Sequence, residues 1–329
     1  MKATNDHTVP QMYLRRFAAT PRSGKGHFIV ARPVEDPSAA FDTNVRKMAA
    51  VKGFYWSANA DGTRAEHGME VLLGRIESRS APAFSSVLED HNYALPRRWP
   101  LSQQLRERIA WWIAAQILRT TRQRDRLVHL LANTKGLHIP KSVAKAAAAN
   151  AHIAFITAQL ARLATVIYDR PWGIGFSDSC LATSDVPVVL LHEHDADDQI
   201  LAAAISDIVL PLDPHRFLYL PGATALSDRQ KRLDHRLKLD GSLGLFVSEI
   251  LRDAADRYIL HHPLHEPPWL DHLHDARPRL PRPWRAEEHP APEYYVSYAV
   301  LPSDVTVERR WLSEHPPRRE SNPDLRPTG

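Results

Sequence analysis

The chain has 329 residues, a formal net charge of +4 and 43% hydrophobic residues, a balance typical of a globular protein. Its single cysteine excludes an intrachain disulfide and any metal site built from several cysteines. No apolar run reaches the roughly 20 residues that a membrane span needs, and the N-terminus lacks the apolar core of a secretory signal. We therefore expect a cytoplasmic protein without a membrane partner.

The first half of the chain is dominated by helical patterns. Residues 27–31 predict a short strand, and apolar residues then recur at helical spacing over 65–87, where Pro82 predicts a break or a kink. A second helical stripe extends over 101–131. A third helix is predicted over 140–167, with a proline near its first turn and an alanine run in its first half.

The second half of the chain changes to short apolar runs bounded by turn residues, which predict strands. These runs are 181–183, 186–191, 208–210, 217–220 and 257–260. A last helix is predicted over 242–256. Helices that precede strands favour an α+β fold, with a helix-rich N-terminal half packed on a mainly antiparallel sheet formed by the second half.

Proline marks the expected domain boundary. Residues 1–262 carry 13 of the 26 prolines and residues 263–329 carry the other 13, while no glycine occurs over 245–328. Proline breaks helices and lacks the donor that a sheet needs. We predict a single α+β domain over 1–262 and a Pro-rich, partly disordered tail over 263–329, in which the aromatic stretch 293–301 docks as a strand.

Polar residues interrupt the apolar face of the second predicted helix. At 100° per residue, Gln116 falls in the middle of the stripe formed with Ile109 and Ile113, and Arg119 falls beside Trp112. A buried amide costs a few kcal/mol (~2–3) unless it is paired. Gln116 is either a structural clamp that bonds to the backbone of a neighbouring strand or loop, or a group that points into a ligand cavity.

The first predicted helix carries two carboxylates, Glu70 and Glu77, at the edge of its apolar face. They either share a cavity or are solvated at a boundary. A pair between Glu77 and Arg119 would be the natural structural use of both side chains.

Arginine is concentrated in the middle of the chain. Residues 95–126 hold eight arginines against Glu107 and Asp125, a local net charge of +6 that exceeds the +4 of the whole chain. Such a segment attracts phosphate or nucleic acid. It is also consistent with an ordinary solvated face.

Histidines are concentrated where the predicted tail begins. His261, His262 and His265 could ligate a transition metal, but Pro263 excludes a helical zinc signature there, and we expect only adventitious metal affinity. Cys180 precedes a predicted strand, and we expect it to be buried and inert.

The N-terminal segment is the most specific stretch of the sequence. Residues 7–17 (HTVPQMYLRRF) resemble the opening of a bacterial family known as domain of unknown function 4238. Further motifs follow in the family's order: 44–47, 53–55, Glu70, 76–77, 116–120, 183–187, 211–214 and 255–258. The resemblance covers about 5–262 and departs at Ser248, where asparagine is expected, and at Val186. It implies a bacterial intracellular protein and no established activity, cofactor or catalytic residue.

The resemblance selects polar residues that lie in different predicted elements: His7, Gln11, Glu77, Gln116, Arg119, Ser184 and Asp185. In one interpretation they share a cleft, where His7, Glu77 and Asp185 are catalytic and hold a divalent metal or exchange protons. Gln11, Gln116, Arg119 and Ser184 would then bind the substrate. In the other interpretation the same groups form a buried hydrogen-bond network.

Two functions follow. The first is a cytoplasmic bacterial hydrolase, metal-assisted in one version, that acts on a phosphate-containing or nucleic-acid substrate. The second is a non-catalytic recognition or accessory module, for example in phage defence or a toxin–antitoxin system, that binds a nucleic acid or a protein partner. Neither the metal nor the oligomeric state follows from the sequence.

Overall fold

The computed structural model describes residues 5–20, 26–56, 68–88, 101–132, 141–177, 180–191, 199–222, 235–238, 241–268 and 306–307. Its helices are α1 (Gln11–Leu14), the 3₁₀ helix η1 (Arg15–Phe17), α2 (Gly68–Val87), α3 (Gln103–Leu118), α4 (Thr121–Ala132), α5 (Lys141–Asp169), α6 (Gln199–Ile205) and α7 (Gly241–Ala254). Its early strands are β1 (Asn5–His7), β2 (Phe28–Pro33), β3 (Phe41–Asn44) and β4 (Ala50–Lys52). The later strands are β5 (Gly173–Phe176), β6 (Thr183–Ser184), β7 (Val189–Leu191), β8 (Asp207–Asp213), β9 (Arg216–Leu220), β10 (His235–Lys238), β11 (Tyr258–His261) and β12 (Thr306–Val307).

The strands form two larger sheets and one small one. The six-stranded sheet has the order β12-β10-β5-β9-β8-β7 and is antiparallel except where β10 pairs with β5. The four-stranded sheet, β3-β2-β11-β6, is antiparallel throughout. The small sheet pairs β1 with β4. The predicted α+β class is confirmed, although β2 and β3 bring strands from the N-terminal half into the second sheet.

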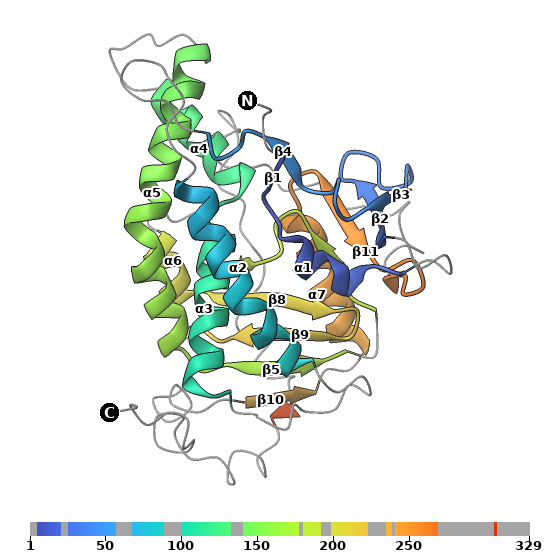
Figure 1. Cartoon of the computed structure of the whole chain (residues 1–329). Coiled ribbons are helices and arrows are strands. Elements are labelled where there is room, and N and C mark those ends of the chain that lie inside the picture. The colour runs from blue at the N-terminus through green and yellow to red at the C-terminus, as the bar shows by residue number, and fades with distance from the viewer. Residues whose placement is uncertain are drawn as a thin grey trace, which may run out of the picture.

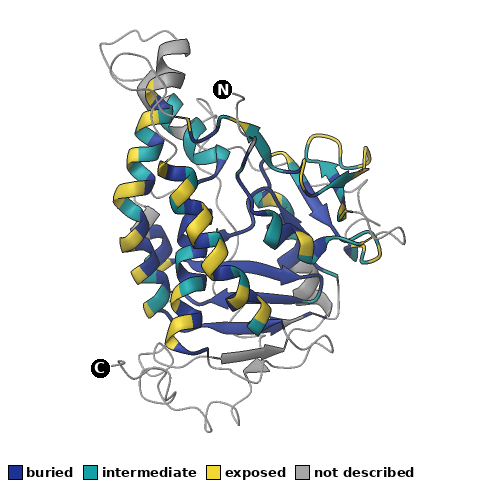
Figure 2. Ribbon diagram, viewed as in Figure 1, coloured by how far each residue is buried: buried dark blue, intermediate teal, exposed yellow. Residues whose placement is uncertain are grey.

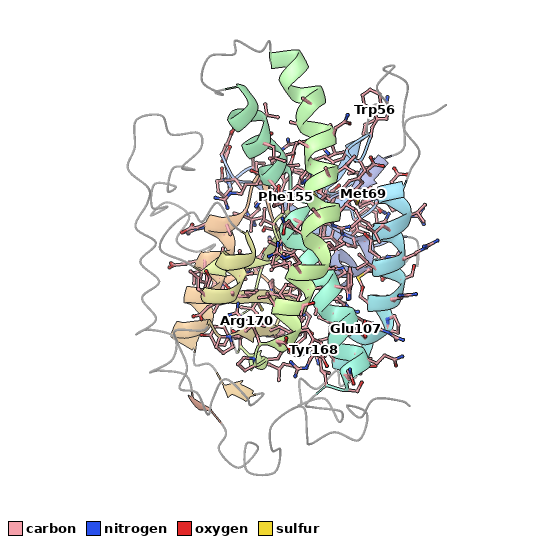
Figure 3. All side chains as sticks on the ribbon, turned by 90° about the vertical axis from the view of Figure 1, so that its left-hand side faces the viewer. Trp56, Met69, Glu107, Phe155, Tyr168 and Arg170 are labelled. Carbon is pink, nitrogen blue, oxygen red and sulfur yellow. The ribbon has the colours of Figure 1, made fainter. Side chains whose placement is uncertain are left out.

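The six-stranded sheet is covered on both faces. Helices α2, α3 and α5 lie side by side in one layer, and α7 lies on the other side of the sheet (Figures 1 and 3). Along β8, Ile208 and Leu210 join the core under the helical layer, whereas Val209 joins the cluster that contains Val247 of α7. Because side chains alternate between the two faces of a strand, a sheet covered on both sides needs a continuous apolar run, and β8 has one.

Helix α2 is continuous through Pro82, so the predicted break does not occur. Proline inside a helix costs about 3 kcal/mol because it removes one hydrogen bond and crowds the preceding turn. The Pro82 ring is exposed, while Leu73, Ile76 and Phe84 are buried on the opposite face. Burial of that face outweighs the local cost of the proline.

The second predicted helix is in fact two helices. Helix α3 ends with Arg119 as its C-cap, and α4 begins at Thr121. The Thr120 hydroxyl accepts a hydrogen bond from the backbone N–H of Gln123 at 3.2 Å, which is the geometry of a helix N-cap. Arg119 and Thr120 at this junction are buried. Figure 2 shows strands β8 and β9 of the six-stranded sheet buried beside the helical layer, whose outer face is exposed.

Helix α5 confirms the third predicted helix. In the described residues one stretch, Ala147–Asp169, is long and apolar enough to cross a membrane, judged by length and composition alone. Its mean hydropathy is 1.3. The core helix of a globular protein meets the same criterion, and α5 packs against α3, α4 and α6. At its C-terminal end the buried Arg170 guanidinium donates to the carbonyls of Ala203, Ser206, Leu220 and Pro221, which fixes the helix to the sheet.

The tail is described only in part. The strand predicted at 293–301 lies outside the described residues. Further along, Thr306 and Val307 form β12 and pair with Lys238 and Leu237 of β10. The domain boundary near residue 262 stays a prediction.

Candidate functional site

The N-terminal segment is fixed to the body of the protein by buried hydrogen bonds. The Thr8 backbone N–H and hydroxyl both donate to the carbonyl of Ala49, at 2.9 and 3.1 Å. The Tyr13 hydroxyl lies 2.7 Å from the Thr183 hydroxyl and donates to the carbonyl of Pro211 at 2.8 Å. These contacts join α1 to strands β6 and β8.

Gln116 is buried on the core face of α3, as its helical phase predicts. With the amide turned so that its oxygen faces Arg119, that oxygen accepts from Arg119 Nε at 2.7 Å, and the amide nitrogen donates to the Thr8 carbonyl at 3.3 Å. Both ends of the amide therefore have partners. This geometry agrees with the clamp interpretation, because the amide bonds to the backbone of a neighbouring segment.

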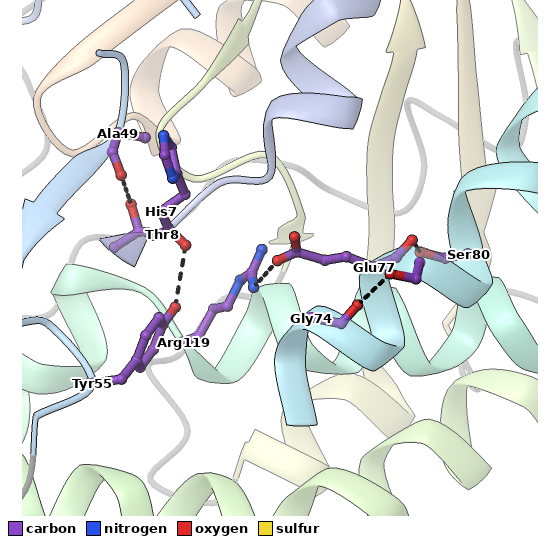
Figure 4. A network of polar contacts seen from close by, with 9 residues as sticks. His7, Thr8, Ala49, Tyr55, Gly74, Glu77, Ser80 and Arg119 are labelled. Atoms are coloured by element: carbon purple, nitrogen blue, oxygen red, sulfur yellow. Dashed lines mark hydrogen bonds and ion pairs between the residues drawn. The ribbon is translucent and has the colours of Figure 1, made fainter. Parts of the chain in front are cut away.

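Arg119 continues the network to α2. Its Nη1 donates to Oε1 of Glu77 at 2.7 Å, so the interhelical pair suggested by the sequence is present (Figure 4). The Arg119 side chain is 1% exposed and that of Glu77 is 30% exposed. Glu77 thus stays partly solvated while it neutralises a buried guanidinium, which lowers the cost of burying that charge.

His7 and Gln11 lie beside this network and have other partners. The His7 Nε2 lies 3.1 Å from the carbonyl of Arg46 and 3.3 Å from Nε2 of Gln11. Figure 4 shows the His7 ring directed away from Arg119 and Glu77. Its backbone carbonyl accepts from the Tyr55 hydroxyl at 3.4 Å.

Asp185 belongs to a second buried polar group, which reaches the start of α4 through Asp256. Its two oxygens accept from the backbone N–H groups of Asp256 and Arg257, both at 2.8 Å, in the turn between α7 and β11. Burial, together with the neighbouring Asp256 carboxylate, raises the pKa of Asp185 to about 6. Asp256 in turn accepts from the Thr121 hydroxyl at the start of α4, at 2.5 Å.

The Ser184 side chain forms hydrogen bonds within its own turn. Its hydroxyl donates to the Val186 carbonyl at 2.9 Å and accepts from the Val186 backbone N–H at 3.0 Å. The predicted site residues therefore fall into separate sets of contacts. Arg119 bonds to both Gln116 and Glu77, whereas His7 contacts Gln11. Ser184 bonds within its own turn, and Asp185 bonds to the α7–β11 turn.

Three of the eight arginines in the predicted basic segment, Arg106, Arg119 and Arg124, make contacts inside the protein. Arg106 is buried, with its guanidinium 4.9 Å from the ring centre of Trp172. The Arg124 guanidinium lies 3.9 Å from the ring centre of Phe54, and its Nη2 is 3.3 Å from Nδ1 of His152. The side chains of Arg97, Arg98 and Arg126 lie outside the described residues. The local net charge of +6 is therefore not a single surface patch.

Sequence reasoning missed His152. It is fully buried in α5, and its Nε2 donates to the Leu118 carbonyl at 2.8 Å, which leaves Nδ1 to accept from Arg124. Burial, then the Arg124 charge, lowers the pKa of His152 to about 4. The available signal was its place on the apolar face of the third predicted helix.

A different basic surface lies around β3 and β4. Arg46, Lys47 and Lys52 are exposed, and the Trp56 side chain is 40% exposed. We call these four residues the β3–β4 surface. Lys52 pairs with Asn5 of β1 and Arg46 contacts His7, so both ends of this stretch lie against the first strand. Figure 3 places Trp56 at the edge of the described fold.

Fold and site together define an α+β protein in which polar motif residues join the N-terminal segment, α2, α3 and the α7–β11 turn. Residues 5–263 match the family described as Protein of unknown function (DUF4238), and the chain belongs to that family. The match confirms the resemblance seen in the N-terminal segment. No curated protein and no solved structure matches the chain.

Proposed function

We propose that this protein is a non-catalytic, cytoplasmic recognition module that binds single-stranded nucleic acid on the β3–β4 surface. The observation that carries the proposal is that Trp56, Arg46, Lys47 and Lys52 are all exposed within one short stretch of the chain. Residues 43–60 contain three basic residues and no acidic residue. Cations that follow a phosphate backbone, together with an aromatic ring on which bases stack, are what single-strand binding requires.

The hydrogen bonds of the motif residues also support this proposal. Arg119 bonds to both Glu77 and Gln116, and Gln116 bonds to the Thr8 backbone. The Asp185 carboxylate accepts hydrogen bonds from two backbone N–H groups of the α7–β11 turn. The Gln116 bond to Thr8 positions the segment that follows β1, and β1 pairs with β4. In the proposed function the motif residues hold the binding surface in place.

The test is fluorescence anisotropy with labelled 20-nucleotide DNA and RNA over a range of salt concentrations. We expect binding that weakens steeply with salt. The triple variant R46A/K47A/K52A should weaken binding roughly tenfold or more, and W56A should weaken it separately, since one stacked base is worth about 1–3 kcal/mol.

The control is the triple variant R75A/R79A/R162A, which removes the same charge from exposed positions on α2 and α5. It should bind as the wild type does. Absence of binding at low salt would overturn the proposal, and so would equal weakening by both triple variants, because that result would show only a response to net charge.

A hydrolase is the second candidate, and one observation favours it. The pKa of Asp185 is raised to about 6, close to the range in which a carboxyl group exchanges protons near neutral pH. The Asp256 carboxylate is the neighbour that contributes to this shift. The metal-assisted version would need His7, Glu77 and Asp185 to hold a divalent ion, although their ligand atoms do not converge in the described structure.

The hydrolase candidate is tested with single-stranded oligonucleotides and small phosphate esters in the presence of Mg²⁺ or Mn²⁺. Under this candidate the wild type releases product, and D185N and E77Q lose activity while they stay folded. If D185A and E77A stay folded and bind the ion as the wild type does, the metal-assisted version is wrong.

A further inference from the structure

Three side chains that could ligate a metal converge away from the motif residues. Cys180 Sγ lies 3.9 Å from Nε2 of His215 and 3.7 Å from Nδ1 of His265, and the two ring nitrogens are 3.2 Å apart. Among the described histidine, cysteine, aspartate and glutamate residues, these three form the group whose ligand atoms all lie within 4.8 Å of one another. All three side chains are half-buried.

The separations agree with a tetrahedral metal centre. With Zn–S about 2.3 Å and Zn–N about 2.0–2.1 Å, a sulfur and a nitrogen ligand lie about 3.6 Å apart, and two nitrogen ligands about 3.3 Å apart. The three observed separations differ from these values by no more than about 0.3 Å, so side-chain movements of that size would complete the geometry.

The backbone holds each ligand in place. The N–H of Leu181, next to Cys180, donates to the Pro214 carbonyl at 2.7 Å, which joins the Cys180 segment to the β8–β9 turn. The Cys180 carbonyl accepts from Ser248 of α7 at 3.5 Å. His265 closes a turn in which its N–H donates to the His262 carbonyl at 3.1 Å.

His215 also has the outer hydrogen bond expected of a metal ligand. Its Nδ1 lies 3.2 Å from the Ser177 carbonyl, which can only accept, so Nδ1 carries the proton. The Nε2 lone pair therefore faces Cys180 and His265. Metal-ligating histidines usually donate their other ring N–H to a carbonyl or a carboxylate in this way. In the metal-free protein, Nδ1–H of His265 can donate to this lone pair.

We infer that Cys180, His215 and His265 form a binding site for one thiophilic transition-metal ion, with Zn²⁺ as the best fit. Nitrogen and sulfur ligands in this number suit Zn²⁺, and three protein ligands leave one tetrahedral position for water. On binding, the Cys180 S–H bond breaks, the sulfur–metal bond forms and the proton passes to solvent, while His265 moves its ring proton to Nε2.

This site is separate from the proposed nucleic-acid surface. It joins the segment before β6, the β8–β9 turn and the turn after β11, whereas the β3–β4 surface lies beside β1. His265 also follows residue 263, where the family match ends. The sequence-based expectation of a buried Cys180 does not hold, because the residue is half-buried and its thiol contacts two imidazoles. The expectation that the thiol is inert stays a prediction.

The test uses the full chain after removal of metal with a chelator. Titration with Co²⁺ should saturate at one equivalent, with a thiolate-to-cobalt charge-transfer band and the visible bands of tetrahedral cobalt, and Zn²⁺ should displace both. C180S should abolish the charge-transfer band. H215Q and H265Q should each weaken Co²⁺ binding at least roughly tenfold. The matched control H27Q, at a half-buried histidine elsewhere, should bind as the wild type does.

A second measurement does not depend on whether the variants fold. Cys180 is the only cysteine of the chain, so alkylation with iodoacetamide reports on this thiol alone. One equivalent of Zn²⁺ should slow alkylation of the wild type at least roughly tenfold, since the bound thiolate is no longer free to react. Unchanged alkylation together with cobalt spectra that lack the sulfur band would overturn the inference and leave only adventitious binding to surface histidines.

Discussion

At the scale of single residues, the protein uses its motif side chains to connect segments that are far apart in the sequence. Gln116 joins α3 to Thr8, Arg119 joins α3 to Glu77 of α2, and Asp185 joins β6 to the turn before β11. Each of these groups would carry a desolvation penalty if its partner were removed. Their energetic effect is therefore best seen when one member is taken away.

Substitution E77A should lower the free energy of unfolding by about 2 kcal/mol, because the 1% exposed Arg119 would keep its charge and lose its carboxylate partner. The value is below the usual 3–5 kcal/mol for a buried pair, since Glu77 is itself partly solvated. E77Q should lose less, because its amide oxygen can still accept. Urea denaturation measures both, with exposed E107Q on α3 as the control, and equal stability of E77A and E107Q would contradict the prediction.

His152 should make stability depend on pH. Its pKa is about 4 in the folded protein and 6.5 for an ordinary histidine, so between these values the unfolded chain binds more protons. The contribution of neutral His152 is complete above about pH 6.5 and is lost as the pH falls toward 4, by up to about 3 kcal/mol. The stability difference between the wild type and H152L, from urea denaturation at several pH values, should shrink by that amount.

The difference between the two proteins is the informative quantity, because Asp185 acts in the opposite direction. Its pKa is raised from 3.8 to about 6, so the folded protein binds more protons in that range and loses this contribution to stability as the pH rises. Asp185 is present in both proteins and cancels. Parallel stability curves for the wild type and H152L would show that His152 does not titrate as described.

At the scale of helices and strands, glycine positions show how local geometry fixes the fold. Gly74 lies in the exposed part of α2, and a Cβ added there would meet nothing within 4 Å. Gly175 of β5 lies opposite Phe217 of β9, and its Cβ would come within 2.0 Å of the Phe217 ring. The same substitution should therefore have opposite effects at the two sites.

G74A should raise the free energy of unfolding by about 1 kcal/mol, because alanine loses less backbone entropy than glycine in a helix. G175A should lower it by about 1–3 kcal/mol, because the added methyl group forces the Phe217 ring out of its position. Each variant serves as the control for the other in the same denaturation experiment. Stabilisation by G175A would mean that the β5–β9 pair can absorb the methyl group.

Helical phase was sufficient to predict the buried position of Gln116 and the place of Arg119 beside the apolar face, since these depend on spacing within one helix. The pair with Glu77 joins two helices, and charge complementarity suggested it. The break between α3 and α4 was missed because the apolar stripe keeps its phase across it, although Thr120 and Thr121 carry the N-cap signal. The convergence of Cys180, His215 and His265 had no local signal at all, because three separate turns create it.

At the scale of the whole molecule, the family match ends at residue 263 and β12 lies beyond it. A chain that ends at Pro268 keeps every described element except β12. It should unfold cooperatively, with a loss of less than about 1 kcal/mol, because a two-residue strand supplies few hydrogen bonds. Thermal and urea unfolding test this, and a chain that unfolds without a cooperative transition would show that the domain extends beyond residue 268.

Removal of β12 also changes the outer side of the six-stranded sheet. Within the described residues, β10 would become its edge, and unpaired edges promote association between chains. Light scattering of the shortened chain should therefore show more association with rising concentration than the full chain shows.

Arg170 has a consequence for how the molecule comes apart. Its guanidinium binds carbonyls at the end of α6, in the connection to β8 and at the end of β9, and it sits directly after α5. If the helical layer or the sheet opened alone, the buried Arg170 guanidinium would lose its carbonyl acceptors. Hydrogen exchange should therefore find the amides of α5 and β9 opening together, as one cooperative unit, with a shared free energy of opening.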